Sequence, residues 1–164
     1  TMTDHSSAQL LELIQSLENV SMQLNEVLKK EHETLSLNDS QQLLELSKTK
    51  KAFVSKLESQ TKVVHLYLKN IKIENGLYGF TAFLSEQKPS DVSTLLETSW
   101  QNIQSLAEDN KTLNHSNGAM IELNRRHVQR SLEVLRGQVG KETSTYGADG
   151  QTMTSKISRN ISTV

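Results

Sequence analysis

The chain has no cysteine, a single proline and very few aromatic residues. Without cysteine it can form neither a disulfide bond nor a thiol nucleophile, which is typical of proteins from a reducing compartment. No apolar run approaches the roughly 20 residues that span a bilayer, and no signal peptide is visible at the start. We therefore expect a cytoplasmic protein without membrane insertion.

Strong net charge is also lacking, because the 164 residues carry a formal charge of −1 at pH 7. Such a chain has no global field that attracts nucleic acid or an anionic membrane. Nucleic-acid binding would also need basic residues gathered beside stacking aromatic side chains, and they are not gathered here. We expect no nucleic-acid partner.

The residues that are abundant favour helices, since leucine, glutamine, serine, glutamate and lysine dominate. We predict an all-α fold: an elongated antiparallel bundle of three long helices, a short aromatic connecting helix and a C-terminal tail or helix. The predicted helices cover about 6–36, 40–73, 80–87 and 91–136. The predicted organisation is a helical bundle over 1–137 and a flexible or partner-dependent tail over 138–164.

Short polar segments separate the predicted helices. Asp39 is placed to cap the second helix, and Gly76 is placed to end it. Within that helix, Lys50 interrupts the apolar seam and can lay its methylenes along the seam with its ammonium in water. The aromatic segment 77–84 either closes one end of the bundle or forms an exposed docking site.

The longest predicted helix, 91–136, carries asparagine where its seam should be apolar. Leucine and isoleucine occupy the first positions of a seven-residue series, and Asn110, Asn117 and Asn124 occupy the next three. A buried asparagine can fix the register between helices, but three in succession also fit a wet seam or a polar partner. Gly118 adds a weak point where the helix could bend.

This helix is also longer than the two before it. At ~1.5 Å per residue, the three long helices span ~45, ~51 and ~69 Å. Residues 125–136 should therefore overshoot the bundle or bend, although Val128, Leu132 and Leu135 form an apolar face there. Such a face needs a cover, which could be residues 153–164, a second subunit or another protein.

Motifs for catalysis or metal binding are absent from the sequence. None of the five histidines follows a glutamate by three residues, and there is no Gly-x-Ser-x-Gly or glycine-rich phosphate loop. Glu31, His32 and Glu33 are consecutive, so they point to diverging faces of a helix and read as solvated surface. We predict no enzyme, no catalytic residue, no metal site and no cofactor.

Two motifs in the C-terminal half resemble FlgN-type flagellar export chaperones. The first is Asn-x-x-Asn-Gly at 114–118, inside the run 114–126, and the second is Tyr-Gly-x-x-Gly at 146–150. Leu132 and Leu135 lie between them, and the resemblance extends over most of the chain before residue 153.

The resemblance implies a cytosolic chaperone of the flagellar type III export system. Such proteins bind a terminal helical segment of hook-associated (hook–filament junction) proteins, prevent their premature assembly and present them to the export apparatus. It implies that cargo binds in the C-terminal part, where the candidate residues are Asn117, Met120, Ile121, Asn124, Val128, Leu132 and Leu135. Tyr146 resembles a tail tyrosine associated with docking to the export apparatus. The alternative is a non-enzymatic helical scaffold or a coiled-coil module that self-associates through its C-terminal helix.

Overall fold

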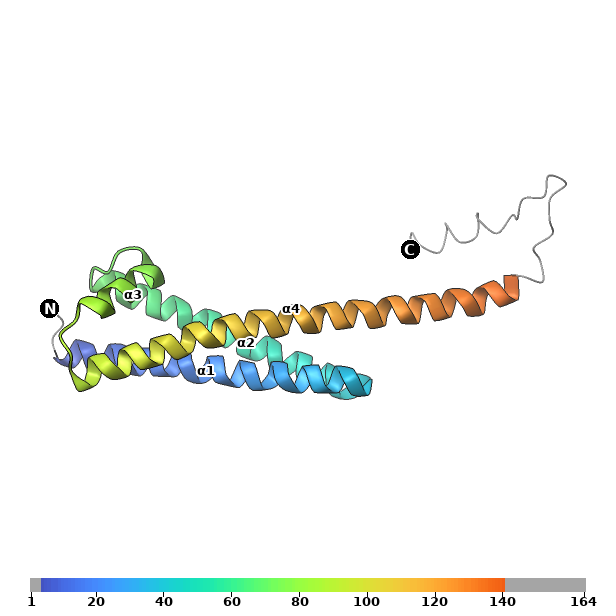
Figure 1. Cartoon of the computed structure of the whole chain (residues 1–164), viewed down its shortest axis with the longest axis horizontal. Helices are drawn as coiled ribbons and strands as arrows, with labels where there is room; N and C mark the ends of the chain where they lie inside the picture. The colour runs from blue at the N-terminus through green and yellow to red at the C-terminus, as the bar shows by residue number, and fades with distance from the viewer. Residues whose placement is uncertain (1–3, 141–164) are drawn as a thin grey trace. The chain divides into compact units, whose positions relative to one another are not determined.

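The computed structural model describes residues 4–140, with side chains over 5–137, and every element in that range is a helix (Figure 1). The all-α prediction is therefore confirmed. The helices are α1 (Asp4–Leu37), α2 (Ser40–Asn70), α3 (Gly76–Glu86) and α4 (Asp91–Gly140). The chain divides into two compact units, Thr1–Gly118 and Ala119–Val164, which we call unit 1 and unit 2.

A turn of two residues makes α1 and α2 antiparallel neighbours. Asn38 adopts a left-handed conformation with φ of 56°, which asparagine tolerates better than most residues. The Asp39 carboxylate then accepts a hydrogen bond of 3.1 Å from the backbone N–H of Gln42 and caps α2 as predicted.

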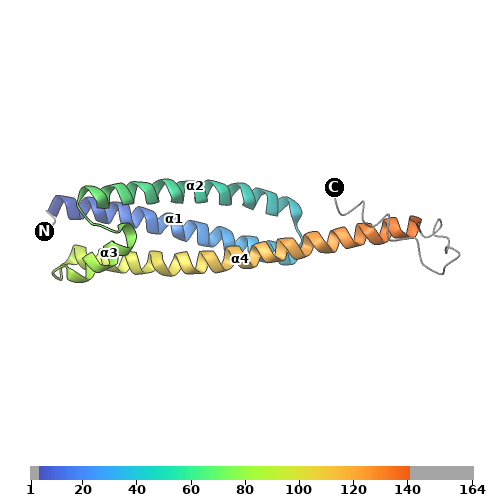
Figure 2. The same cartoon turned by 90° about the horizontal axis from the view of Figure 1, so that it is seen from above.

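The core of unit 1 lies along α1, which contacts both α2 and the first part of α4. Figures 1 and 2 show these three helices side by side. A cluster of buried residues joins them at the end near α3: Leu10, Ile14 and Leu17 of α1, Val64 and Leu68 of α2, and Leu96, Trp100 and Ile103 of α4. Burial continues along α1 through Val20, Leu24, Val27, Leu28 and Leu35.

The short helix α3 closes this end of the core. Phe80 is fully buried, and its ring meets that of Trp100 edge to face with centroids 5.1 Å apart. The Trp100 indole Nε1 donates a 2.8 Å hydrogen bond to the Thr81 hydroxyl, so the polar edge of the indole is also satisfied. Of the two interpretations of segment 77–84, the closing plug is confirmed, although Tyr78 of this helix is 91% exposed.

The connection between α2 and α3 differs from the prediction. Helix α2 ends at Asn70 rather than near residue 73, and Gly76 begins α3 instead of ending α2. The chain reverses through three residues in the left-handed region: Lys72 at φ 64°, Asn75 at 66° and Gly76 at 57°. Sequence reasoning identified the glycine as a break but could not show which helix it belongs to.

Helix α4 begins with a reciprocal serine cap and continues past its predicted end. The Ser93 N–H donates to the Ser90 hydroxyl at 3.1 Å, and the Ser90 N–H donates to the Ser93 hydroxyl at 2.8 Å. The helix extends to Gly140 rather than Arg136, so residues 138–140 of the predicted tail are helical. The rest of that tail, 141–164, lies outside the described residues.

Candidate functional site

Residues 119–137, the described part of unit 2, carry a set of exposed apolar side chains. Six large ones are 46–64% exposed: Ile121, Leu123, Val128, Leu132, Val134 and Leu135. At 100° per residue, four of them fall within an arc of about 60° on one face of α4. We call these four, Ile121, Val128, Leu132 and Leu135, the apolar stripe.

The apolar stripe is more than scattered surface hydrophobicity. Single exposed leucines are ordinary on proteins, whereas a contiguous apolar face on a helix normally meets another surface. Leu123 and Val134 point about 130–150° away from the centre of the stripe. They were not singled out from the sequence, and at 64% and 61% exposure they offer an internal comparison that is at least as exposed as the stripe.

The structure brings most, but not all, of the predicted cargo residues onto this face. Ile121, Val128, Leu132 and Leu135 form the stripe, Asn124 is exposed at its edge, and Met120 is half-buried. Asn117 is fully buried inside unit 1, so its inclusion in a cargo surface needs correction. Tyr146 lies outside the described residues.

The buried Asn117 amide of α4 contacts α1 directly, and its partner Glu31 of α1 also pairs with Lys50 of α2. Its Nδ2 donates to the Leu28 carbonyl oxygen at 2.9 Å and to the Glu31 carboxylate at 3.0 Å, while His32 Nδ1 lies 3.0 Å from its Oδ1. The Lys50 ammonium of α2 reaches the same Glu31 oxygen at 3.2 Å. We call Glu31, His32, Lys50 and Asn117 the Glu31 cluster.

The Glu31 cluster overturns two expectations. Glu31 is 3% exposed and half-buried His32 contacts Asn117, so these two residues are not the solvated surface that was predicted, whereas Glu33 is exposed. The ammonium of Lys50 was expected to be solvated, but it forms an ion pair with the Glu31 carboxylate. A buried carboxylate needs such partners, since an unpaired charge in a core is strongly destabilising.

Asn110 makes a second polar contact in the same seam. It accepts a hydrogen bond of 2.9 Å from Asn25 Nδ2 and donates one of 3.1 Å to the Ser21 carbonyl oxygen. Both asparagines of the pair are buried. The buried, hydrogen-bonded Asn110 and Asn117 fit the register interpretation, and the wet-seam interpretation fits only the exposed Asn124.

Charged residues accompany the apolar stripe. Arg125 donates two hydrogen bonds, of 2.9 and 3.0 Å, to the two carboxylate oxygens of Glu122, and Arg126 adds one of 3.1 Å. These hydrogen bonds, those from Arg125 first, lower the pKa of Glu122 from 4.5 to about 2. Glu122 in turn raises the pKa of Arg125. Unit 2 thus presents apolar side chains beside a charge network that is fully ionised at neutral pH.

The described residues offer no arrangement for metal chemistry. Across residues 4–140, no three histidine, aspartate or glutamate side chains come close enough together to hold a metal ion. In the same part of the chain, no helix combines the length and the apolar character needed to cross a membrane. Unit 2 instead exposes apolar side chains along one face of its helix.

Comparison with known proteins gives one result. The family model described as FlgN protein matches residues 2–154, which is most of the chain. No curated protein and no solved structure matches the sequence.

Proposed function

The chain belongs to the FlgN family of flagellar export chaperones, and from this premise we propose that it is a cytoplasmic chaperone for hook-associated proteins. It binds the terminal helical segment of these hook–filament junction proteins, prevents their premature assembly and delivers them to the export apparatus. The apolar stripe is the surface that covers the cargo segment. The family match and the chain's lack of catalytic motifs argue together for a binding protein rather than an enzyme.

The observation that carries the proposal is the exposure of the apolar stripe. Ile121, Val128, Leu132 and Leu135 are between 46% and 60% exposed on one face of a helix. A second amphipathic helix is the complement that such a face fits, with anchors at spacings of three, four and seven residues. Exposed Asn124 at its edge, together with half-buried Met120, widens the proposed surface.

The energetics favour reversible capture. Burying the exposed halves of four aliphatic side chains contributes about 3–6 kcal/mol. Association itself costs at least about 4 kcal/mol in lost translational and rotational freedom. The stripe alone therefore does not hold cargo tightly, and further polar contacts must add to it. A complex of this kind blocks self-assembly of the cargo and still dissociates without a chemical step.

Tyr146 is proposed as the residue that docks on the export apparatus. The support is the resemblance of its Tyr-Gly-x-x-Gly motif to the tail motif of the family. Cargo capture and docking then use separate segments of the chain. A Tyr146→Ala variant should still retain cargo in solution but lose secretion of that cargo.

The cargo surface is tested by replacing two stripe residues with serine. Leu132→Ser/Leu135→Ser should abolish retention of purified hook-associated proteins on the immobilised chaperone. The matched control is Leu123→Ser/Val134→Ser, which removes side chains that are at least as exposed from another face of the same helix. Equal loss in both variants would contradict the stripe, as would full retention in the first. Far-UV circular dichroism confirms that each variant keeps its helices.

The alternative function is a non-enzymatic scaffold that self-associates through the stripe. The specific observation in its favour is that one apolar face can pair with its own copy in a coiled coil. Light scattering of the isolated protein distinguishes the two. A stable dimer that is lost in Leu132→Ser/Leu135→Ser and undisturbed by cargo would support the scaffold. A monomer that binds cargo would support the chaperone.

A further inference from the structure

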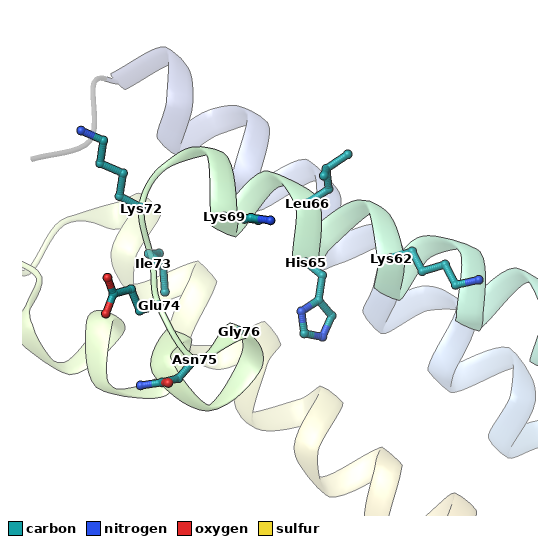
Figure 3. A pocket seen from close by; sticks show the side chains of 9 residues that line it. All are labelled: Lys62, His65, Leu66, Lys69, Lys72, Ile73, Glu74, Asn75 and Gly76. Carbon is teal, nitrogen blue, oxygen red and sulfur yellow. The ribbon is translucent and has the colours of Figure 1, made fainter.

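A second surface lies in unit 1, at the C-terminal end of α2. The last turns of α2 and the loop to α3 enclose an open cleft of about 770 Å³. Lys62, His65, Leu66 and Lys69 line it from α2, at the spacings of three, four and seven that define one helix face. Lys72 and Ile73 line it from the loop. Figure 3 shows the His65 ring pointing from α2 towards Gly76.

Among the side chains that the structure describes, no ion pair neutralises the positive charge of this cleft. Within residues 5–137 the ion pairs involve Lys50, Arg125 and Arg126, and none involves the three cleft lysines. The cleft contains one acidic residue, Glu74, which forms no ion pair with these lysines. Three lysines therefore line the cleft together with apolar side chains, and Leu66 among these is 62% exposed.

The loop wall of the cleft is held in an unfavourable backbone conformation. Lys72 has φ of 64°, a left-handed conformation that costs a residue with a Cβ about 1 kcal/mol or more. Gly76 approaches His65 so closely that a Cβ there would lie 2.6 Å from the ring Cε1. Glycine would adopt this left-handed conformation at lower energy, so stability does not explain why a lysine occupies position 72.

We propose that this cleft binds an acidic peptide segment of a partner protein, one that also carries apolar side chains. Its carboxylates pair with Lys62, Lys69 and Lys72, and an apolar residue packs on Leu66 and Ile73. Charge complementarity points to this occupant, because these lysines form no ion pair among the side chains of residues 5–137. This surface is separate from the apolar stripe and goes beyond the proposed cargo binding.

A peptide fits the cleft better than the other anionic macromolecules. Single-stranded nucleic acid is usually bound on phenylalanine, tyrosine or tryptophan rings, and none of these lines the cleft. A membrane surface is met by the outward face of an amphipathic helix, whereas these lysines line an open cleft beside a helix and a loop. Both classes nevertheless serve as competitors in the test.

The test is fluorescence anisotropy at low salt with the full-length protein and a labelled peptide of alternating acidic and leucine residues. Lys62→Gln/Lys69→Gln should weaken binding about five- to tenfold, since each exposed pair contributes modestly. The matched control is Lys48→Gln/Lys56→Gln, which removes the same charge from exposed positions of α2 outside the cleft. It should change the affinity less than about twofold.

Several outcomes would overturn the proposal. These are equal weakening by the control pair, no binding of the acidic peptide to the wild type, and equal binding of the same peptide with glutamine in place of the acidic residues. Displacement of the peptide by single-stranded DNA or by anionic vesicles, at a lower concentration than by unlabelled peptide, would also overturn it. Leu132→Ser/Leu135→Ser must leave peptide binding unchanged, which separates this proposal from the cargo surface.

Two further variants distinguish the contributions of lysine charge and of cleft shape to peptide binding from a loss of folding. Lys72→Gly removes a charge and relieves the backbone, so it should weaken peptide binding while the protein unfolds at the same or a higher urea concentration. Gly76→Ala keeps every charge but forces the His65 ring away, so it should weaken binding through the shape of the cleft. Unchanged binding in Lys72→Gly and Gly76→Ala together would refute the assignment of this cleft.

Discussion

Replacing Asn117 with alanine should destabilise unit 1 far more than the same replacement of an exposed asparagine would. The substitution removes the amide that donates to the Leu28 carbonyl oxygen at 2.9 Å and to the Glu31 carboxylate at 3.0 Å. Both bonds are buried, and the second involves a charged acceptor. Lys50 remains as a partner of Glu31 at 3.2 Å, so the carboxylate loses one hydrogen bond but keeps an ion pair.

The size of the effect follows from these two bonds. A buried neutral hydrogen bond contributes about 0.5–1.5 kcal/mol and a charge-assisted one about 1.5–3 kcal/mol. The variant should therefore lose about 2–4 kcal/mol of unfolding free energy. With an m-value of about 2 kcal/mol/M, the urea midpoint falls by about 1–2 M.

Trp100 provides the measurement. It is the single tryptophan of the chain and is 5% exposed in the core of unit 1, so its fluorescence reports the unfolding of that unit. The control is Asn124→Ala, the same substitution one step further in the seven-residue series, at an exposed position. It should change the stability by less than about 0.5 kcal/mol. Equal midpoints for the two variants would refute the structural role of Asn117.

A double-mutant cycle adds a second condition. If Asn117 acts mainly through Glu31, then Asn117→Ala should cost less in a Glu31→Gln background than in the wild type. The difference should be about 1 kcal/mol or more, because the charge-assisted part is already gone. Strict additivity would mean that the two side chains stabilise the protein independently, contrary to their 3.0 Å contact.

Three other predictions follow from the described residues. Because the pKa of Glu122 is lowered to about 2, its ion pairs stabilise the helix above pH 4.5 and are lost as the pH falls from 4.5 towards 2. An NMR titration of the Glu122 carboxyl should have its midpoint near pH 2, and Arg125→Gln should raise that midpoint. Gly79→Ala should lower stability by about 1–3 kcal/mol because its Cβ would collide with a backbone carbonyl oxygen of the preceding loop, whereas Gly118→Ala meets open space and should be neutral or stabilising. Deletion of 138–164 should leave the melting temperature of unit 1, followed by Trp100 fluorescence, nearly unchanged.

The sequence predicts the helices well because each signal is local. Asp39 caps the helix that follows it, and apolar spacing identifies the buried faces of α1 and α4. The predicted end of α2 was wrong, because Glu74-Asn75-Gly76 has the composition of a stop whichever helix the glycine joins. Only the backbone shows that Asn75 precedes α3.

The polar seam could not be worked out from the sequence because its partners are distant. Asn117 and Glu31 are separated by 86 positions, and Asn110 and Asn25 by 85. Periodicity indicates that an asparagine lies on a packed face, but not which group opposes it once the helices are in register. Spacing alone identified Val128, Leu132 and Leu135, since an uncovered face has the same periodicity as a covered one. The length of the helix indicated that this face is uncovered, and Ile121 was a candidate only through the resemblance.

The placement of α1 between α2 and α4 has a consequence for synthesis on the ribosome. α1 meets α2 across a turn of two residues, but it meets α4 only after a further 50 or more positions. At about 5–20 residues per second, the α1–α2 hairpin can form several seconds before α4 is complete. During that time the face of α1 that α4 will cover is exposed to other nascent chains. Ser21, Asn25 and Glu31 lie on that face, and their polarity makes the unfinished hairpin less prone to aggregate than an all-leucine seam would be.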